Sequence, residues 1–427
     1  MEQTDLDSYK IVPKRVRKLL KAGKNVMLHG AAGTGKSTIL KAITKHNKNT
    51  VVLAPTGIAA LNVGGQTIHS FFGFSFGYLS AKDIKGCGKQ APILRKKPLI
   101  IIDEVSMVRA DVFNAIDLSL RRCLFSNLPF AGLQILLLGD TGQLPPIVTE
   151  QEAQFFKSGN EMFFRSASYK LGKFIHVELD EIHRQTNEKF IDFLLNVRKD
   201  SARRRDMDWF NSKVEVMDTD EYFATDTSDS TVLCMTNARA SDYNNTMYNN
   251  LDGPETVYEA RVVGRFNESE YPTDYELGLK VGSKVVLLKN SKAKNFVNGS
   301  VGTVTRLKSD AVHVNIKGTE CRVEADTWEK YAYVASEYGV EKQVIGSFKQ
   351  IPVKLAWAIT VHKSQGMTLN RFHLDLDRRS FAHGQMYVAL SRARSIKGIS
   401  VTRALSKSDV IVDQSKIMQL DEEDNDD

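Results

Sequence analysis

The 427-residue sequence has few of the features that mark secreted or membrane proteins. Its four cysteines (Cys87, Cys123, Cys234 and Cys321) are widely spaced and form no Cys-x-x-Cys pair, which argues against a zinc site and a disulfide framework. No apolar run approaches the ~18 residues of a membrane span, and Met1–Asp5 lack the basic and apolar regions of a signal peptide. We therefore expect an intracellular protein with ordinary thiols and no membrane association.

Positive charge is in excess but unevenly distributed along the chain. The formal net charge is +7, although the last seven residues, Asp421–Asp427, contain six acids, so that 58 basic residues face 45 acidic ones in the rest. A basic body suits a polyanion such as nucleic acid, because cationic side chains neutralise phosphates and release counterions. We expect residues 413–427 to be a disordered acidic tail, either a solubilising end or a docking peptide for a protein partner.

Gly30–Ser37 has the Gly-x4-Gly-Lys-Ser spacing of a phosphate loop. In such a loop, backbone N–H groups surround the α- and β-phosphates, the lysine reaches the β- and γ-phosphates, and the hydroxyl holds Mg²⁺. A short apolar strand over 25–29 and a helical pattern over 37–45 flank it and complete an anion site, a context that a chance match in a loop would lack. The expected nucleotide-binding residues are Gly30, Gly33, Thr34, Gly35, Lys36, Ser37 and Thr38, with Ser37 also a metal ligand.

Two carboxylates, Asp103 and Glu104, directly follow the apolar run Leu99–Ile102. A strand beside the phosphate-loop strand would place Asp103 to hold Mg²⁺ and Glu104 to orient and deprotonate the attacking water. Two acids after a strand can also be a helix cap, an alternative that the phosphate loop disfavours. A third apolar run leads to Gln143, whose amide can bond a γ-phosphate or the water that attacks it.

The first ~180 residues alternate short β-branched runs with helical patterns, which predicts an α/β fold with a parallel sheet. The runs over 51–54, 99–102 and 134–138 are expected to be buried central strands. Each ends in polar or glycine-bearing residues, where open α/β sheets bind ligands. Phe71–Tyr78 is aromatic and glycine-rich without a helical pattern, and indicates a small excursion from the sheet.

A second alternating region begins at about residue 179, with a strand over 231–235, and is interrupted at about 256–345. The interruption holds short strands over 284–288, 302–305 and 312–316, and Asn298-Gly299 is a tight-turn signal. This spacing indicates a small β-barrel inserted into a second α/β domain. The host domain is expected to resume and to continue to about Val412.

The ordered motifs resemble those of superfamily 1 helicases over most of the chain. The matching segments are Gly30–Ser37, Ala54–Gly57, Asp103–Ser106, Gly139–Pro146, Leu179–Gln185, Thr360–Gly366 and Tyr387–Arg392. Gln-Leu-Pro-Pro and Val-His-Lys-Ser-Gln-Gly resemble the RecD-like branch, whose members move 5′ to 3′. Phe190–Arg198 and Phe296–Gly302 resemble segments of the petite integration frequency (Pif) helicases.

This resemblance implies two RecA-like parallel-sheet domains, a small inserted β-hairpin or wedge, and an inserted SH3-like β-barrel. The implied boundaries are 1–178 for the first RecA-like domain, about 71–95 for the wedge, 179–255 and 346–412 for the second RecA-like domain, 256–345 for the SH3-like domain, and 413–427 for the tail.

The resemblance also assigns roles to residues of the second domain. Arg184 and Arg392 match the arginine fingers of the family, and a guanidinium offers a fixed fork of donors to an anionic transition state. Arg392 could instead pair with surface acids. Gln365 and Gly366 are implied to bind nucleotide. With Lys36, Asp103, Glu104 and Gln143, the two arginines form the expected catalytic set.

The DNA contacts implied by the resemblance are expected on both domains. Hydroxyl, amide and backbone N–H groups suit sequence-independent phosphate binding, and aromatic rings can stack on bases. Each phenylalanine of Phe71–Tyr78 could equally be packed inside the protein. The expected DNA-binding residues are Thr56, His69, Phe72, Pro145, Thr236, Asn237, Thr360, His362 and Lys363.

The chain departs from the family pattern before the phosphate loop. Family members place an adenine-reading glutamine about 27 residues before the loop lysine, whereas the only glutamine before Lys36 is Gln3. The choice between ATP and GTP is therefore open, and Tyr9 is one possible base contact.

The resemblance implies an ATP- and Mg²⁺-dependent 5′-to-3′ single-stranded DNA translocase and DNA helicase of replication, repair, recombination or telomere and genome maintenance. Expected partners are single-stranded and forked or structured DNA, in the cytoplasm or nucleoid; RNA remains open as the tracked strand, and a monomer could suffice. One alternative is a DNA-stimulated ATPase that remodels protein–nucleic acid complexes without separating strands. Another is a non-catalytic binding module, which the intact motif residues disfavour.

Overall fold

The computed structural model describes residues 9–86, 88–156, 160–225, 230–291, 296–336, 339–377 and 380–419. Cys87 and the acidic residues Asp421–Asp427 lie outside these ranges. Cys123, Cys234 and Cys321 are buried, and none of them forms a disulfide with another described cysteine.

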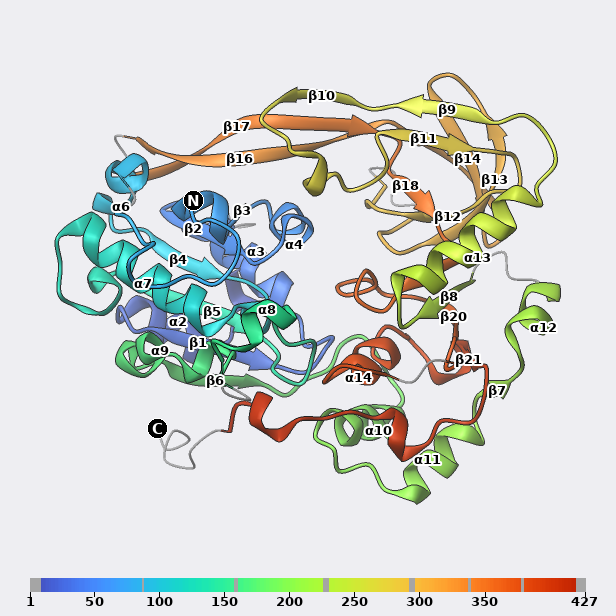
Figure 1. The fold of residues 1–427 in the computed structure, drawn as a ribbon, viewed down its shortest axis with the longest axis horizontal. Helices are drawn as coiled ribbons and strands as arrows, with labels where there is room; N and C mark the ends of the chain where they lie inside the picture. The colour runs from blue at the N-terminus through green and yellow to red at the C-terminus, as the bar shows by residue number, and fades with distance from the viewer. Residues whose placement is uncertain are drawn as a thin grey trace.

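The first unit is a six-stranded parallel sheet in the order β3-β2-β4-β5-β1-β6. Its central strands are apolar and buried along their whole length because helices cover both faces (Figure 1). The strands are β1 (Val26–Gly30), β2 (Thr50–Ala54), β3 (Gln66–Thr67), β4 (Leu99–Ile102), β5 (Ile135–Gly139) and β6 (Ile175–Leu179). The strands expected over 25–29, 51–54, 99–102 and 134–138 are thus confirmed.

Helices of the first unit connect these strands. They are α2 (Lys14–Lys21), α3 (Lys36–His46), α4 (Gly57–Asn62), α5 (Ile68–Phe72), α6 (Ala91–Arg95), α7 (Ala110–Leu124), α8 (Glu150–Ala153) and α9 (Ala167–Gly172), with short 3₁₀ turns η1 (Gly88–Gln90), η2 (Val105–Met107), η3 (Pro129–Gly132) and η4 (Phe163–Arg165).

The second unit is a five-stranded parallel sheet in the order β19-β8-β20-β21-β7. The strands are β7 (Glu215–Val216), β8 (Ser230–Cys234), β19 (Ala358–Thr360), β20 (Arg371–Leu374) and β21 (Ile399–Val401). The helices are α10 (Glu188–Arg198), α11 (Arg204–Asn211), α12 (Thr219–Ala224), α13 (Asn237–Asn249) and α14 (Gln385–Leu390), with 3₁₀ turns η6 (Ile396–Gly398), η7 (Lys407–Asp409) and η8 (Gln414–Lys416). Two parallel sheets confirm the α/β class.

An antiparallel insertion separates β8 and α13 from β19. Its strands are β9 (Thr256–Glu259), β10 (Arg261–Gly264), β11 (Glu276–Leu279), β12 (Lys284–Leu287), β13 (Val301–Leu307), β14 (Ala311–Ile316), β15 (Thr319–Glu324), β16 (Asp326–Ser336), β17 (Gly339–Gln350) and β18 (Val353–Leu355), with η5 (Glu268–Glu270) between β10 and β11. The expected boundary at residue 345 is wrong, because β18 pairs with β12 and so extends the insertion to Leu355. The Asn298-Gly299 turn joins β12 to β13, with Gly299 at φ +89°.

The long hairpin β16–β17 leaves the insertion and runs across the first unit toward α6 (Figure 1). The Tyr333 hydroxyl, on β16, accepts a hydrogen bond from the Val52 N–H at 2.7 Å and donates to the Val52 carbonyl at 3.1 Å. Val52 lies on β2, and β3 is too short to pair with this part of it. Tyr333 therefore satisfies backbone groups that the sheet edge would leave unpaired.

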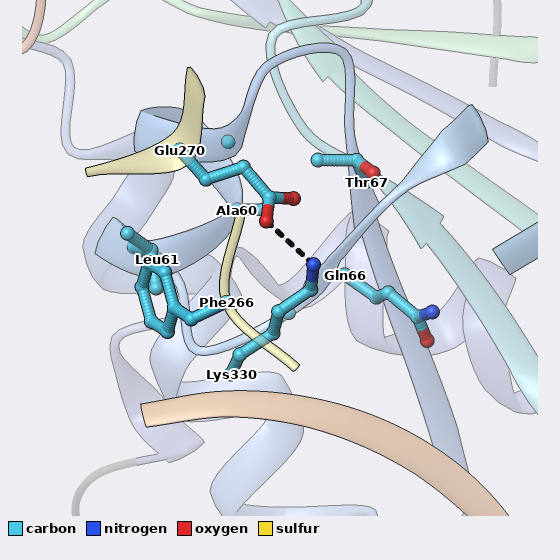
Figure 2. A pocket seen from close by; sticks show the side chains of 9 residues that line it. Ala60, Leu61, Gln66, Thr67, Phe266, Glu270 and Lys330 are labelled. Carbon is cyan, nitrogen blue, oxygen red and sulfur yellow. Dashed lines mark hydrogen bonds and ion pairs between the residues drawn. The ribbon is translucent and has the colours of Figure 1, made fainter. Parts of the chain in front are cut away.

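A small pocket marks a second contact between the insertion and the first unit (Figure 2). Lys330 of β16 pairs with Glu270 of η5 at 2.6 Å, next to α4 and β3. Phe266 lies beside Leu61 of α4 in one apolar cluster. The insertion thus packs against α4 of the first unit through apolar side chains, while the ion pair joins two segments of the insertion beside that contact.

Two further expectations need correction. The described residues of 71–95 contain no strand, so the expected hairpin is wrong: Phe71 and Phe72 end α5 and pack into the core of the first unit, and α6 closes the segment. The expected disordered tail does not begin at 413, because Lys416 pairs with Glu161 at 2.9 Å and the Tyr169 hydroxyl donates to Met418 Sδ at 3.5 Å. None of the helices in the described ranges is both long and apolar enough to cross a membrane.

Candidate nucleotide site and nucleic-acid interface

The phosphate loop joins β1 to α3 at the carboxyl edge of the first sheet. Lys36 donates from Nζ to the carbonyls of Gly30 at 2.7 Å and Ala31 at 3.0 Å, so its ammonium lies within the loop. Gly33 has φ +89°, and a Cβ there would lie 2.7 Å from Arg184 Cβ. Both the backbone conformation and the close approach therefore require glycine. Ser37 and Thr38 are exposed in the first turn of α3.

Asp103 and Glu104 follow β4 at the same edge of the sheet. Burial raises the pKa of Asp103 to about 7, with a contribution from the Glu104 charge. Burial also raises the pKa of Glu104, and Lys36 and Arg392 oppose that rise. Glu104 has a left-handed backbone, φ +50° and ψ 42°, a conformation that costs energy for a non-glycine residue and often marks functional sites.

Gln143 belongs to a buried network that the sequence did not reveal. Its Nε2 donates to Asp140 Oδ2 at 3.1 Å, and Arg198 of α10 donates from Nε to Asp140 Oδ1 at 2.8 Å. The Arg198 charge and hydrogen bonds from Arg198 and Gln143 hold the pKa of Asp140 low against its burial. This ion pair connects the turn after β5 to the second unit. Arg198 ends the Phe190–Arg198 segment noted in the sequence, but nothing in the sequence pairs it with Asp140.

Arg392 is 2% exposed at the end of α14. It donates to the Val388 carbonyl from Nε at 2.9 Å and to the Ser391 hydroxyl from Nη2 at 2.8 Å. Burial, with a contribution from Arg184, lowers its pKa to about 9. No ion pair to Arg392 is found among the described residues, so the alternative of a surface pair with acids is wrong. Because its hydrogen-bond acceptors are neutral, the positive charge of this buried guanidinium is not neutralised and can interact with a bound anion.

Arg184 reaches the same region from the segment after β6. Its Nη1 donates to the Ser391 carbonyl at 2.8 Å, and the backbone N–H of the preceding residue, His183, donates to the Gly33 carbonyl at 2.9 Å. Arg184 therefore lies beside the phosphate loop, and its bond to Ser391 places it next to Arg392. The two expected arginine fingers thus lie close together although they come from opposite ends of the second unit's sequence.

Three further residues link the two units at this site. The Tyr387 hydroxyl accepts from the Ala32 N–H of the phosphate loop at 2.8 Å. Gln365 donates from Nε2 to Glu104 Oε2 at 3.3 Å, which places this expected nucleotide-binding residue against the carboxylate. His383 Nε2 lies 2.8 Å from the Thr141 carbonyl. Gly366 lies on the exposed turn after Gln365.

The donor set suits Mg²⁺ better than a transition metal. Among the described residues no group of three or more His, Cys, Asp or Glu side chains could hold a metal ion. Mg²⁺ instead uses one or two protein oxygens, water and substrate phosphates. The Ser37 hydroxyl and the Asp103 carboxylate fit that pattern. The pKa of Asp103 is raised because the carboxylate is buried and the charge of Lys36 does not fully offset the burial.

The two units place their expected DNA-binding threonines in matching positions. Thr56 follows β2 and caps α4 by accepting from the Ala59 N–H at 3.2 Å. Thr236 follows β8 and caps α13 by accepting from the Arg239 N–H at 3.4 Å, and Asn237 is exposed in the first turn. Each helix thus begins beside a threonine at the carboxyl edge of a parallel sheet, where N–H groups can meet phosphate.

The exposed aromatic rings are different from those expected. Phe72 is buried in the core of the first unit and stacks on Phe74, so its expected contact with DNA is wrong. Phe76 is 91% exposed and stacks on His69, with ring centroids 5.4 Å apart. On the second unit, Phe381 is 61% exposed and its ring is nearly parallel to that of His362 at 6.3 Å.

The remaining expected DNA residues are divided by exposure. Thr360 is buried, and its hydroxyl accepts from the Lys363 N–H at 3.3 Å. Lys363 is exposed, and Pro145 is half-buried in the turn after Gln143. Tyr9, considered for a base contact, stacks on His46 at 3.9 Å at the far end of α3 from the phosphate loop.

A family model described as PIF1-like helicase matches residues 7–207. ATP-dependent DNA helicase Pif1 of Bdellovibrio bacteriovorus is 32% identical over 396 residues, which cover 89% of this chain and 84% of that protein. The chain belongs to the PIF1-like helicase family. ATP-dependent DNA helicase PIF1 of Xenopus laevis is 33% identical over 399 residues, and the chain spans 59% of that protein's length.

Solved structures of the PIF1-like family have the same fold. Bacteroides sp Pif1 in complex with ADP-AlF4 superposes with a TM-score of 0.86 at 34% identity, covering 94% of both chains. Bacteroides Pif1 bound to single-stranded DNA gives a TM-score of 0.67 at 34% identity, covering 95% of both chains. Unliganded Pif1 from Bacteroides sp matches about equally well, with a TM-score of 0.85 at 34% identity. The arrangement of this chain is therefore nearer to the nucleotide complex and the unliganded structure than to the DNA complex.

Proposed function

We propose that this protein is an ATP-driven single-stranded DNA translocase that separates duplex DNA in the 5′-to-3′ direction. The observation that carries the proposal is the meeting of two units at one phosphate loop. Lys36, Asp103 and Glu104 come from the first unit, and Arg184 and Arg392 come from the second. A site built in this way turns nucleotide hydrolysis into relative motion of the two units.

Each residue of the site has a role in hydrolysis. Lys36 binds the β- and γ-phosphates, and Ser37 and Asp103 would hold Mg²⁺, which supplies charge neutralisation to the phosphates when bound. Glu104 orients the attacking water and accepts its proton. Arg392 and Arg184 stabilise charge on the transferring phosphoryl group. Gln143 bonds the γ-phosphate or the water, and the Asp140–Arg198 pair connects it to the second unit.

The DNA path crosses the carboxyl edges of both sheets in this proposal. Thr56 and His69 grip the strand on the first unit, while Thr236, Asn237, His362 and Lys363 grip it on the second, and Pro145 lies between them. Thr360 supports this edge from within. Phe76 and Phe381 replace Phe72 as the rings offered to bases. Opening and closing of the nucleotide site would then alternate the two grips along the strand.

The domain interpretation follows from the same proposal. We take the two parallel sheets as RecA-like domains, over 1–178 and over 179–255 with 356–412, and the antiparallel insertion, over 256–355, as SH3-like. Bacteroides Pif1 bound to single-stranded DNA and a Pif1 structure that concerns unwinding at forked double-stranded DNA by two coordinating Pif1 helicases support these as substrates here. We expect an intracellular, DNA-associated protein that can act as a monomer, with ATP as its nucleotide and the tail free for a protein partner.

The decisive test compares duplexes that carry a single-stranded tail at either the 5′ or the 3′ end. Strand separation and ATP hydrolysis are measured together. The proposal predicts separation of the 5′-tailed duplex only. Separation of the 3′-tailed duplex alone would contradict the polarity, while ATP hydrolysis without strand separation would favour the alternative, a DNA-stimulated ATPase that remodels protein–nucleic acid complexes.

A further inference from the structure

Arg109, directly before α7, makes contacts that the proposed mechanism does not use. Its guanidinium donates to both carboxylate oxygens of Asp111, from Nε at 3.0 Å and from Nη2 at 2.8 Å. Nη1 donates to Glu152 Oε1 at 2.5 Å, and Nη2 donates to the Gly77 carbonyl at 2.6 Å. The side chain is 11% exposed, so these bonds form largely out of water. One arginine thus joins three separate segments.

The Glu152 contact leads back to the nucleotide site. Glu152 belongs to α8, which follows the turn that carries Gln143 and Pro145. Its second oxygen accepts from the N–H of Thr149 at 3.0 Å and from the Thr149 hydroxyl at 2.9 Å. This capping box fixes the carboxylate relative to the chain that leaves Gln143. If the segment between Gln143 and Thr149 moves, Glu152 moves with it and displaces the guanidinium of Arg109.

The Gly77 contact leads to the exposed aromatic ring. Phe76 directly precedes Gly77 in the chain, and Asp111 also accepts from the Leu79 N–H at 2.9 Å. Tyr78 stacks on Phe155, next to α8, at 4.4 Å. The aromatic segment is thus held at Gly77 by Arg109 and at Leu79 by its partner Asp111.

A groove of about 420 Å³ lies where these segments converge. Thr56, His69 and Phe76 line one part of it, and Arg109, Ile147 and Glu152 line another. Its lining therefore combines residues proposed to contact DNA with the chain that leaves Gln143. Arg109 sets the distance between these two parts.

We propose that Arg109 is a positioning residue that couples the segment following Gln143 to the ring of Phe76. When the nucleotide site changes state, the contact through Glu152 and Gly77 moves the ring relative to His69. The consequence for strand separation rests on the proposed function, whereas the coupling itself can be observed in the protein without DNA.

The first experiment measures base pairs separated per ATP hydrolysed on the 5′-tailed fork. Arg109→Lys keeps the charge but loses the planar fork that reaches three acceptors. We expect the ratio to fall about fivefold or more, while DNA-stimulated ATP turnover stays within about twofold, because displacement of positioning groups by about 1 Å has large effects. Arg121→Lys is the matched control, since Arg121 lies on α7, the helix that Arg109 precedes, and pairs with Asp117 at 3.2 Å.

Two outcomes would overturn the proposal. If turnover and separation fall in proportion, Arg109 supports hydrolysis or folding and does not couple the two. If turnover and separation both stay at the wild-type level, the contacts are dispensable. Should Arg109→Lys unfold, Glu152→Gln decides, because glutamine can retain the capping box while losing the ion pair. In Glu152→Gln, a fall in base pairs separated per ATP that is smaller than fivefold supports the proposal, and an unchanged ratio overturns it.

The second experiment needs no DNA. Phe76→Trp places a fluorescent reporter on the aromatic segment, and its emission is followed as ADP and aluminium fluoride are added. We expect a shift that Arg109→Lys reduces by at least about half. Absence of a shift, or a shift that Arg109→Lys leaves unchanged, would overturn the coupling. If the shift depends on Arg109 but the protein separates no strands, the proposed function fails and the coupling stands.

Discussion

Residues of the nucleotide site derive their properties from burial more than from local sequence. The charges of Glu104, in the first unit, and Arg392, in the second, act on each other, and both pKa values are shifted: that of Glu104 is raised and that of Arg392 is lowered to about 9. Each shift reflects the cost of keeping a charge out of water. An anionic phosphoryl group between them would compensate the arginine, and the carboxylate would be left to act on water.

The role of Glu104 is tested by Glu104→Gln. The amide keeps the shape and can still bond Gln365, but it cannot accept a proton from water. We expect the kcat for ATP to fall about 100-fold or more, with nucleotide binding retained, as measured by steady-state turnover and by titration with a fluorescent nucleotide. Glu276→Gln, at an exposed position on β11, is the control. Turnover near the wild-type rate would contradict the assigned role.

A helix or strand could be predicted from the sequence where a single local pattern, an apolar run or a helical spacing, was sufficient to form it. The buried strands β1, β2, β4, β5 and β8 follow from apolar runs, and α3 follows from its helical spacing. The hairpin expected at 71–95 is absent from the described residues, and the sequence could not show this, because tertiary packing decides that Phe71 and Phe72 are buried. The β16–β17 hairpin also escaped prediction, since its docking on β2 depends on residues about 280 positions apart in sequence, Tyr333 and Val52.

The docking of β16 on β2 is tested by Tyr333→Phe. Loss of the hydroxyl leaves the buried N–H and carbonyl of Val52 without partners, which we expect to cost about 2 kcal/mol. The readouts are the urea midpoint and amide hydrogen exchange of β2. Tyr331→Phe, on the same strand with its hydroxyl bonded to Glu329 at 2.5 Å, should change stability by less than about 0.5 kcal/mol. Equal midpoints and exchange rates for the two variants would refute the role of Tyr333.

Across the two units, the sequence indicates the proposed catalytic residues one by one, but it does not indicate the contacts that connect them. Lys36, Asp103, Glu104 and Gln143 follow strands of one sheet, so their proximity follows from topology. The contacts that join the units, such as Tyr387 to Ala32 and Arg198 to Asp140, bring together residues with no shared local pattern. They depend on how the two units pack, which short-range sequence signals do not encode.

Buried histidines in both units predict acid sensitivity of the folded state. Burial lowers the pKa values of His29 and His373 to about 4 each. Below pH 6.5 the unfolded chain binds protons that the folded chain refuses until about pH 4, so stability falls through that window and is unaffected above it. We expect each histidine to cost about 1.4 kcal/mol at pH 5.5 relative to pH 7.5. The raised pKa of Asp103 acts in the opposite direction over this window, so the test is His373→Asn, which should lose the histidine's share of the pH dependence of the urea midpoint. The same pH dependence in His373→Asn and the wild type would contradict this expectation.

The central claim is that a nucleotide site shared by two units is coupled to single-stranded DNA. The most direct measurement is the steady-state ATP turnover of the full chain with and without single-stranded DNA, with Arg392→Lys tested in parallel. We expect DNA to raise wild-type turnover about tenfold or more, and Arg392→Lys to lose at least about 100-fold of the stimulated rate. Equal turnover with and without DNA would show that the nucleotide site is not coupled to DNA.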